Sequence, residues 1–216
     1  MKRQFAVIGL GRFGSSVARA LNAMGHEVLA VDSDEENVQR MADEVTHAVT
    51  ADATDAAALK AMGIRNFDAV VVAIGDMQAS ILCTLLLKEL GVGDVVAKAD
   101  NDLHGKVLQR TGADRVIYPE RDSGVRLAHN LSASTILDYI ELAPDYSIVE
   151  ISATQALVGK TLRHLALRVT FNVNVIAIRR GSSMNITPQA DDQVLAGDVL
   201  IVVGRNDDIK RLEEYQ

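Results

Sequence analysis

The chain contains, near its N-terminus, the stretch Phe5-Ala6-Val7-Ile8-Gly9-Leu10-Gly11-Arg12-Phe13-Gly14. An apolar run leads into the pattern G-x-G-x-x-G, and apolar residues at helical spacing follow it. In this pattern Gly9 allows a tight turn, Gly11 lets a phosphate approach the backbone, and Gly14 lets the helix pack closely on the strand. The N-terminus of that helix offers free N–H groups to an anion. The stretch predicts the first strand-loop-helix unit of a nucleotide-binding sheet.

Strands and helices alternate from this stretch to about residue 118. We expect further strands at residues 27–32, 47–51, 68–74, 94–98 and 114–118, with helices at 34–43, 56–62, 77–90 and 102–111. Strict alternation of this kind indicates a parallel sheet with helices on both faces. Residues 1–119 are therefore predicted to form an α/β domain, a Rossmann-like doubly wound parallel sheet.

The pattern changes after Pro119. Residues 120–142 show no strand character and are predicted to form one long crossover helix, ended by Pro144. Residues 143–216 are expected to form a smaller α+β domain. Its predicted strands are 146–152, 173–179 and 199–203, and its predicted helices are 161–169 and 206–215.

Composition limits the class of protein. Lys plus Arg number 22 against 29 Asp plus Glu, and a net charge of −7 argues against nucleic acid as a general partner. The single cysteine, Cys83, cannot form an internal disulfide, so we expect an intracellular protein. The longest apolar uncharged run, residues 77–87, is shorter than the roughly 20 residues that a bilayer requires.

Charged residues at the predicted strand ends suggest the ligand. Asp32, at the end of the second strand, would accept hydrogen bonds from ribose hydroxyls and disfavour the 2′-phosphate of NADP. Arg12 opposes the dipole of the helix that it begins, which favours an interaction with the terminal phosphate of ADP or ATP. The alternative is an exposed arginine without a ligand. Other candidate contacts are Phe13, Ser33, Ala53, Ile74 and Gly75.

Two later strand ends add candidate side chains. Asp52 could receive the amino group of adenine, or it could cap the following helix, a role that Thr54 or Asp55 could fill instead. Lys98 ends the fifth strand and could also face the ligand.

We find no arrangement of residues typical of catalysis. Neither a Ser-His-Asp order, nor a His/Cys metal cluster, nor a catalytic lysine motif is present in the sequence. We therefore favour a nucleotide sensor over the alternative enzyme, an NAD-dependent oxidoreductase. A third interpretation is a passive adaptor in which the nucleotide only stabilises the fold.

The predicted helix at residues 77–90 is apolar around most of its circumference. A helix that covers one face of a sheet normally has a single apolar stripe. We therefore expect a second subunit to cover its other side, the alternative being a helix at the centre of the core.

Several segments together resemble a known family. They are the glycine-rich stretch above, residues 25–32, 63–68, 72–75 and 85–90, and Gly112-Ala113-Asp114-Arg115. The chain resembles the KtrA-type regulatory subunits of Ktr/Trk potassium uptake systems, which are RCK (regulator of potassium conductance) proteins. The resemblance implies an RCK N-lobe, a crossover helix and an RCK C-lobe.

The resemblance also implies a mode of action. Family members are cytoplasmic and assemble from dimers into an octameric ring beneath a membrane-embedded potassium channel subunit of the KtrB type. ATP and ADP exchange in the N-lobe gates the channel, and NAD(H) binding is also ascribed to such domains. The family's nucleotide-contacting positions correspond here to Gly11, Arg12, Asp32, Asp52, Gly75, Lys98 and His104.

Two further sites follow from the resemblance. Glu120 matches a position that binds a divalent cation, Mg²⁺ or Ca²⁺, beside the nucleotide phosphates; the alternative is an acid that favours the dipole of its own helix. The family's C-lobes can bind cyclic di-AMP, and the corresponding residues here are Arg168, Asn174, Val175 and Pro188. Arg168 could instead stabilise the C-terminus of its helix.

Overall fold

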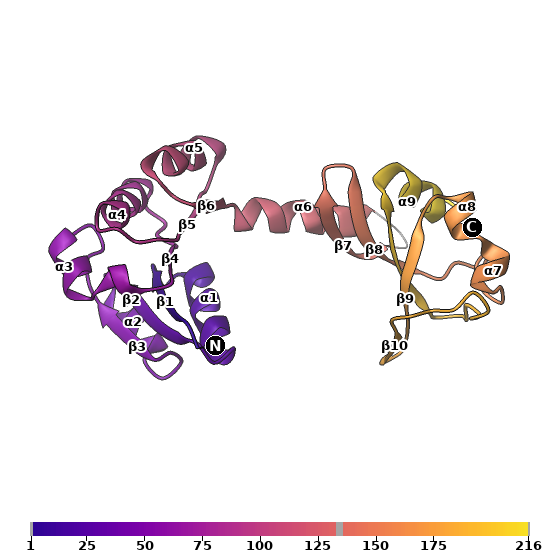
Figure 1. Cartoon of the computed structure of the whole chain (residues 1–216), viewed down its shortest axis with the longest axis horizontal. Coiled ribbons are helices and arrows are strands. Elements are labelled where there is room, and N and C mark those ends of the chain that lie inside the picture. Colours follow the sequence, from indigo (N-terminus) through magenta and orange to yellow (C-terminus); the bar gives the residue numbers. More distant parts are fainter. Residues whose placement is uncertain (1, 133–135, 216) are drawn as a thin grey trace. The chain divides into compact units, whose positions relative to one another are not determined.

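A computed structural model describes residues 2–132 and 136–215 and divides the chain into two compact units, residues 1–121 and 122–216 (Figure 1). The first unit contains β1 (Gln4–Ile8), α1 (Arg12–Ala23), β2 (Glu27–Asp32), α2 (Glu35–Met41), β3 (His47–Thr50), α3 (Ala56–Ala61), the 3₁₀ turn η1 (Ile64–Asn66), β4 (Ala69–Val72), α4 (Met77–Glu89), β5 (Val95–Lys98), α5 (Asp102–Thr111) and β6 (Arg115–Ile117).

All six strands of the first unit run parallel, in the order β3-β2-β1-β4-β5-β6. The order reverses between β1 and β4, and ligands bind sheets of this kind at the carboxyl ends of the strands beside that point. The predicted doubly wound sheet is confirmed.

The sheet buries both of its faces because successive residues of a strand point to opposite sides. Ala6 and Ile8 of β1 contribute to a core with α4 and α5, whereas Val7 contributes to a core with α1 and α2. The all-apolar β4 is buried along its whole length, as expected of a central parallel strand.

The second unit is built on an antiparallel sheet of order β10-β9-β11-β8-β7. Its elements are β7 (Ile136–Ala143), β8 (Tyr146–Ser152), α7 (Leu162–Leu165), α8 (Leu167–Thr170), β9 (Asn174–Arg180), β10 (Ser183–Asn185), β11 (Val199–Arg205) and α9 (Asn206–Glu213). Leucine and isoleucine side chains of α7, α8 and α9 pack against the central strands, which confirms the predicted small α+β lobe.

The long helix predicted for residues 120–142 is wrong in its second half. Helix α6 (Pro119–Ser132) ends earlier, and Ile136–Ala143 pairs antiparallel with β8 as β7. Pro144 and Asp145 form the turn of this hairpin, where proline fixes the backbone angle that a turn requires. Residues 133–135 of the predicted helix lie outside the described residues.

One other prediction in the second unit needs correction. The helix expected at residues 161–169 is divided at Ala166, which has a left-handed φ of 44° and separates α7 from α8. The short edge strand β10 lies outside the predicted strands.

The glycine-rich loop fixes how closely α1 approaches β1. A Cβ atom on Gly14 would lie 1.8 Å from the carbonyl oxygen of Gly9, and one on Gly9 would lie 2.7 Å from the backbone of Ala73. Gly9 also has a φ of 93°, which only glycine adopts readily. By contrast, a Cβ on Gly11 would meet no atom within 4 Å.

We predict that Gly14→Ala destabilises the first unit, because the methyl group has no room against backbone atoms. The expected loss is about 1–3 kcal/mol or more of unfolding free energy. Denaturant unfolding of the full chain measures it, with Gly11→Ala as the matched control that leaves stability nearly unchanged. Equal losses in the two variants would contradict the packing argument.

Candidate functional site

A cavity of about 530 Å³ lies at the carboxyl ends of the parallel strands, beside the point where their order reverses. Its size is typical of sites for small molecules. Its lining residues are Ile8, Gly9, Gly11, Arg12, Phe13, Asp32, Ser33, Asn37, Ala51, Asp52, Ala53, Thr54, Ala73, Ile74, Gly75, Ala79, Lys98 and Glu120. The topology therefore brings together residues that the sequence separates by more than a hundred positions.

The N-terminus of α1 opens into this cavity. Gly11 caps the helix without a side-chain hydrogen bond, and the first turn contains no acidic residue. Arg12 lines the cavity, and its guanidinium group has no ion pair or hydrogen bond among the described residues. Free N–H groups, a positive dipole end and an uncompensated guanidinium together attract an anion.

Asp32 holds the glycine-rich loop in place. Its Oδ2 accepts a hydrogen bond from the Leu10 backbone N–H at 2.6 Å, and its Oδ1 accepts one from Asp34 at 2.9 Å. A carboxylate oxygen can accept more than one hydrogen bond, so the side chain can bind ligand hydroxyls while it supports the loop.

Asp52 follows β3, the strand beside β2, and lines the same cavity as Asp32. Its Oδ1 accepts hydrogen bonds from the N–H and the hydroxyl of Thr54, and these bonds hold its pKa below the usual range. The N-cap of α3 is Asp55, which accepts a hydrogen bond from Ala57, so Asp52 is not that cap. Its Oδ2 has no hydrogen-bond partner among the described residues, so it remains an acceptor for a donor such as an amino group.

Lys98 and Glu120 form an ion pair at the edge of the cavity. The Lys98 Nζ lies 2.9 Å from Glu120 Oε1 and 3.2 Å from Asp100 Oδ1. Burial tends to lower the pKa of Lys98, but the hydrogen bonds to Glu120 and Asp100 outweigh it and raise that pKa. The hydrogen bond from Lys98 in turn lowers the pKa of Glu120.

Two predicted contact residues do not line the cavity. Gly14 lies beneath the loop, where its role is the close packing described above. His104 is fully buried in the first turn of α5, and its Nε2 has no hydrogen-bond partner among the described residues. Asn37 and Thr54 line the cavity although the sequence did not predict them as contacts. A polar residue five positions after Asp32, or two positions after Asp52, belongs to no motif of its own.

A second cavity, of about 380 Å³, lies in the second unit. It is lined by Leu162, Arg163, Ala166, Leu167, Arg168, Val173, Asn174, Val175, Pro188 and Ala190. All four residues singled out in the sequence for this lobe are among them. Arg163 is paired with Asp191 at 2.9 Å, whereas Arg168 has no ion pair among the described residues.

Neither a metal cluster nor a membrane-spanning helix occurs in the described parts of the chain. Among residues 2–132 and 136–215, no three His, Cys, Asp or Glu side chains are grouped as metal ligands. Within the same residues, no helix has the length and apolar character needed to cross a bilayer.

A parallel nucleotide-type lobe followed by a small antiparallel lobe is the architecture of RCK-type regulatory proteins. The TrkA-N domain model matches residues 5–119, and the TrkA-C domain model matches residues 146–216. The chain belongs to this TrkA-N/TrkA-C family.

A full-length relative within this family is a potassium uptake protein. The Ktr system potassium uptake protein C of Bacillus subtilis (strain 168) is 49% identical over 215 residues, which cover 99% of this chain and 97% of the relative. Within this family the chain is accordingly similar over its full length to a Ktr-system potassium uptake protein.

Solved structures agree with the fold. The GsuK RCK domain, 18% identical, matches all of this chain with a TM-score of 0.72, and the match covers 48% of that chain. A GsuK structure bound to ADP is 27% identical and matches 60% of this chain and 33% of its own, with a TM-score of 0.53.

Proposed function

We propose that residues 1–119 bind an adenine nucleotide, ATP or ADP, and that this binding controls potassium flux through a membrane partner. The observation that carries the proposal is the unpaired Arg12 at the N-terminus of α1, above the glycine-rich loop. Asp32 and Asp52 line the same cavity and supply acceptors for a ribose and an adenine amino group. The related GsuK is described as bound to ADP.

Arg12 favours ligands that end in a phosphate. A dinucleotide such as NAD(H) places its phosphates internally, whereas ATP and ADP present a terminal phosphate with more charge. NAD(H) remains the second candidate ligand, because Asp32 suits its ribose equally well.

A divalent cation, Mg²⁺ or Ca²⁺, is proposed to accompany the phosphates at Glu120. Carboxylate and phosphate oxygens are the ligands that these ions prefer. Glu120 lines the cavity with its side chain 67% exposed, so its carboxylate is accessible to a hydrated ion. The metal would screen the repulsion between this carboxylate and the nucleotide.

Residues 143–216 are proposed to bind cyclic di-AMP in the second cavity. Arg168 offers an unpaired cation for a phosphate, and Val175 and Pro188 offer an apolar wall for a base. Asn174 adds an amide that can hydrogen-bond with the ligand.

The chain is further proposed to act as a homo-octamer, built from dimers, on the cytoplasmic side of a KtrB-type potassium channel subunit. Helix α4 buries Cys83 and Leu87 against its own sheet and leaves Leu82 and Leu85 about two-fifths exposed. Exposed apolar side chains on one face mark a contact surface when they are contiguous. A ring can transmit small movements of several nucleotide sites to one membrane partner.

The first prediction for this site is that Arg12→Ala weakens ATP binding by roughly tenfold or more and leaves AMP nearly unaffected. The substitution removes a charge-assisted hydrogen bond to the β- or γ-phosphate, which AMP lacks. Calorimetry on the full chain measures the affinities for ATP and AMP. Repeating the ATP titration with a chelator tests the proposed divalent cation. Arg19→Ala is the matched control, because Arg19 lies on the same helix and pairs with Glu44 instead. Equal losses for ATP and AMP would contradict the role of Arg12, and chelator-independent ATP affinity would contradict the cation.

The second prediction is that Arg168→Ala weakens binding of cyclic di-AMP by roughly tenfold, for the same reason. Titration of the full chain checks it, with Arg211→Ala as the control on a helix that does not line the cavity. A wild-type chain that does not bind cyclic di-AMP would remove this ligand from the proposal.

The third prediction concerns assembly. Light scattering is expected to give about eight times the chain mass of 23.3 kDa, and Leu85→Glu is expected to reduce it by placing a charge in the contact surface. Met24→Glu changes an apolar residue that is 71% exposed at the end of another helix and should leave the mass unchanged. A monomeric wild-type chain with nucleotide bound would defeat the proposed ring.

A further inference from the structure

We propose that Lys98 breaks its ion pair with Glu120 and pairs with the phosphates when a nucleotide binds. Loss of the pair with Glu120 then loosens the first turn of α6. The inference rests on the proposed nucleotide site and goes beyond it in proposing that the Lys98–Glu120 ion pair responds to the charge of the bound phosphates.

The position of Lys98 makes the exchange feasible. Lys98 is the last residue of β5, and its side chain is only 13% exposed. Its ammonium group is therefore confined to the neighbourhood of the cavity. Its Nζ lies 2.9 Å from Glu120 and 3.2 Å from Asp100. Lys98 and Glu120 line the same cavity as Gly11 and Arg12, where phosphates are proposed to bind.

The charges favour displacement of Glu120 rather than of Lys98. One ammonium group faces two carboxylates, so the cluster already carries a net negative charge. Phosphates entering the cavity would add repulsion toward Glu120 and attraction toward Lys98. Glu120 is 67% exposed, so its carboxylate can turn into water when the pair breaks. Its carboxylate would then be available to the proposed divalent cation.

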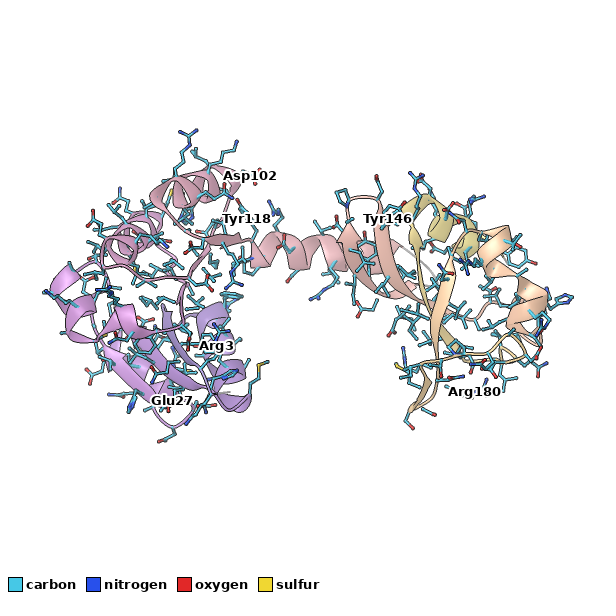
Figure 2. All side chains as sticks on the ribbon, viewed as in Figure 1. Arg3, Glu27, Asp102, Tyr118, Tyr146 and Arg180 are labelled. Carbon is cyan, nitrogen blue, oxygen red and sulfur yellow. The ribbon has the colours of Figure 1, made fainter. Side chains whose placement is uncertain are left out.

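The consequence falls on α6, the helix along which the chain passes from the first unit to the second. Glu120 is the second residue of this helix, and its pair with Lys98 attaches the first turn to the first unit. Arg121 also attaches this turn, since it pairs with Asp102 at 3.1 Å and its Cζ lies 3.8 Å from the centre of the Tyr118 ring. Asp102 and Tyr118 are labelled in Figure 2. Lys98 and Glu120 line the cavity, whereas Asp102 and Arg121 do not, so nucleotide binding selectively weakens the attachment through Glu120.

Calorimetry in the presence of a chelator tests the exchange without the cation. Glu120→Gln removes the competing carboxylate and is expected to bind ATP about three- to tenfold more tightly than the wild-type chain, with adenosine unchanged. Lys98→Gln is expected to weaken ATP by a similar factor. Asp102→Asn, which weakens the attachment outside the cavity, should leave both affinities unchanged.

Hydrogen exchange of the same full-length proteins, again in the presence of a chelator, tests the effect on α6. The wild-type backbone N–H groups of residues 121–126 should exchange faster with ATP than with adenosine. In Lys98→Gln these N–H groups should exchange fast with either ligand. In Asp102→Asn they should still exchange faster with ATP than with adenosine. Thiol labelling verifies that every variant is folded, because Cys83 is fully buried and its burial raises its pKa to about 12.

The outcomes separate this inference from the function on which it rests. Equal or weaker ATP binding by Glu120→Gln in chelator would overturn the exchange while leaving the nucleotide site intact. Identical exchange rates with ATP and adenosine in the wild-type chain would overturn the effect on α6. A wild-type chain that binds no adenine nucleotide would defeat the proposed function itself.

Discussion

The close approach of α1 to the end of β1 is the constraint on which the rest of the first unit depends. Gly14 lies against the carbonyl group of Gly9, leaving no space for a side chain at either position. This contact directs the N-terminus of α1 into the space between β1 and β4. Asp32 then fixes the loop through Leu10. Because backbone groups and one carboxylate hold the cavity wall, the wall is in place before a ligand arrives.

The parallel order of the strands determines what faces that wall. Carboxyl ends of β2, β5 and the segment after β3 meet at one edge, bringing Asp32, Lys98 and Asp52 to a single cavity. The cations Arg12 and Lys98 and the acids Asp32 and Asp52 give the cavity side chains of both signs. A nucleotide has the matching pattern, with an anionic end and hydrogen-bond donors on its ribose and base. In the same arrangement Lys98 already pairs with two carboxylates, so a bound phosphate would compete with them for its ammonium group.

Helix α6 begins beside the cavity of the first unit and continues into the second unit. Its Val125, Leu127 and Leu131 side chains are each about half exposed or more. A 14-residue helix is marginally stable on its own, so interactions at its ends influence it strongly. The TrkA-N and TrkA-C domain models match the chain on either side of this helix, at residues 5–119 and 146–216. Under the proposed function, α6 is therefore the segment through which the state of the first lobe reaches the second.

Local patterns in the sequence determined the six parallel strands, the glycine-rich turn and most of the residues around the cavity. They did so because strand and helix periodicity, together with turn-forming glycines, are properties of short segments. Residues 136–143 were predicted wrongly, since Leu137 and Ile140 suit a helical stripe as well as a strand, and pairing with β8 decides between them. Tertiary structure alone placed Gly14 and His104 outside the cavity, added Asn37 and Thr54, and joined Lys98 to Glu120. Which strand ends become neighbours, and which side chains then compete for one cation, depends on contacts between segments that no local pattern records.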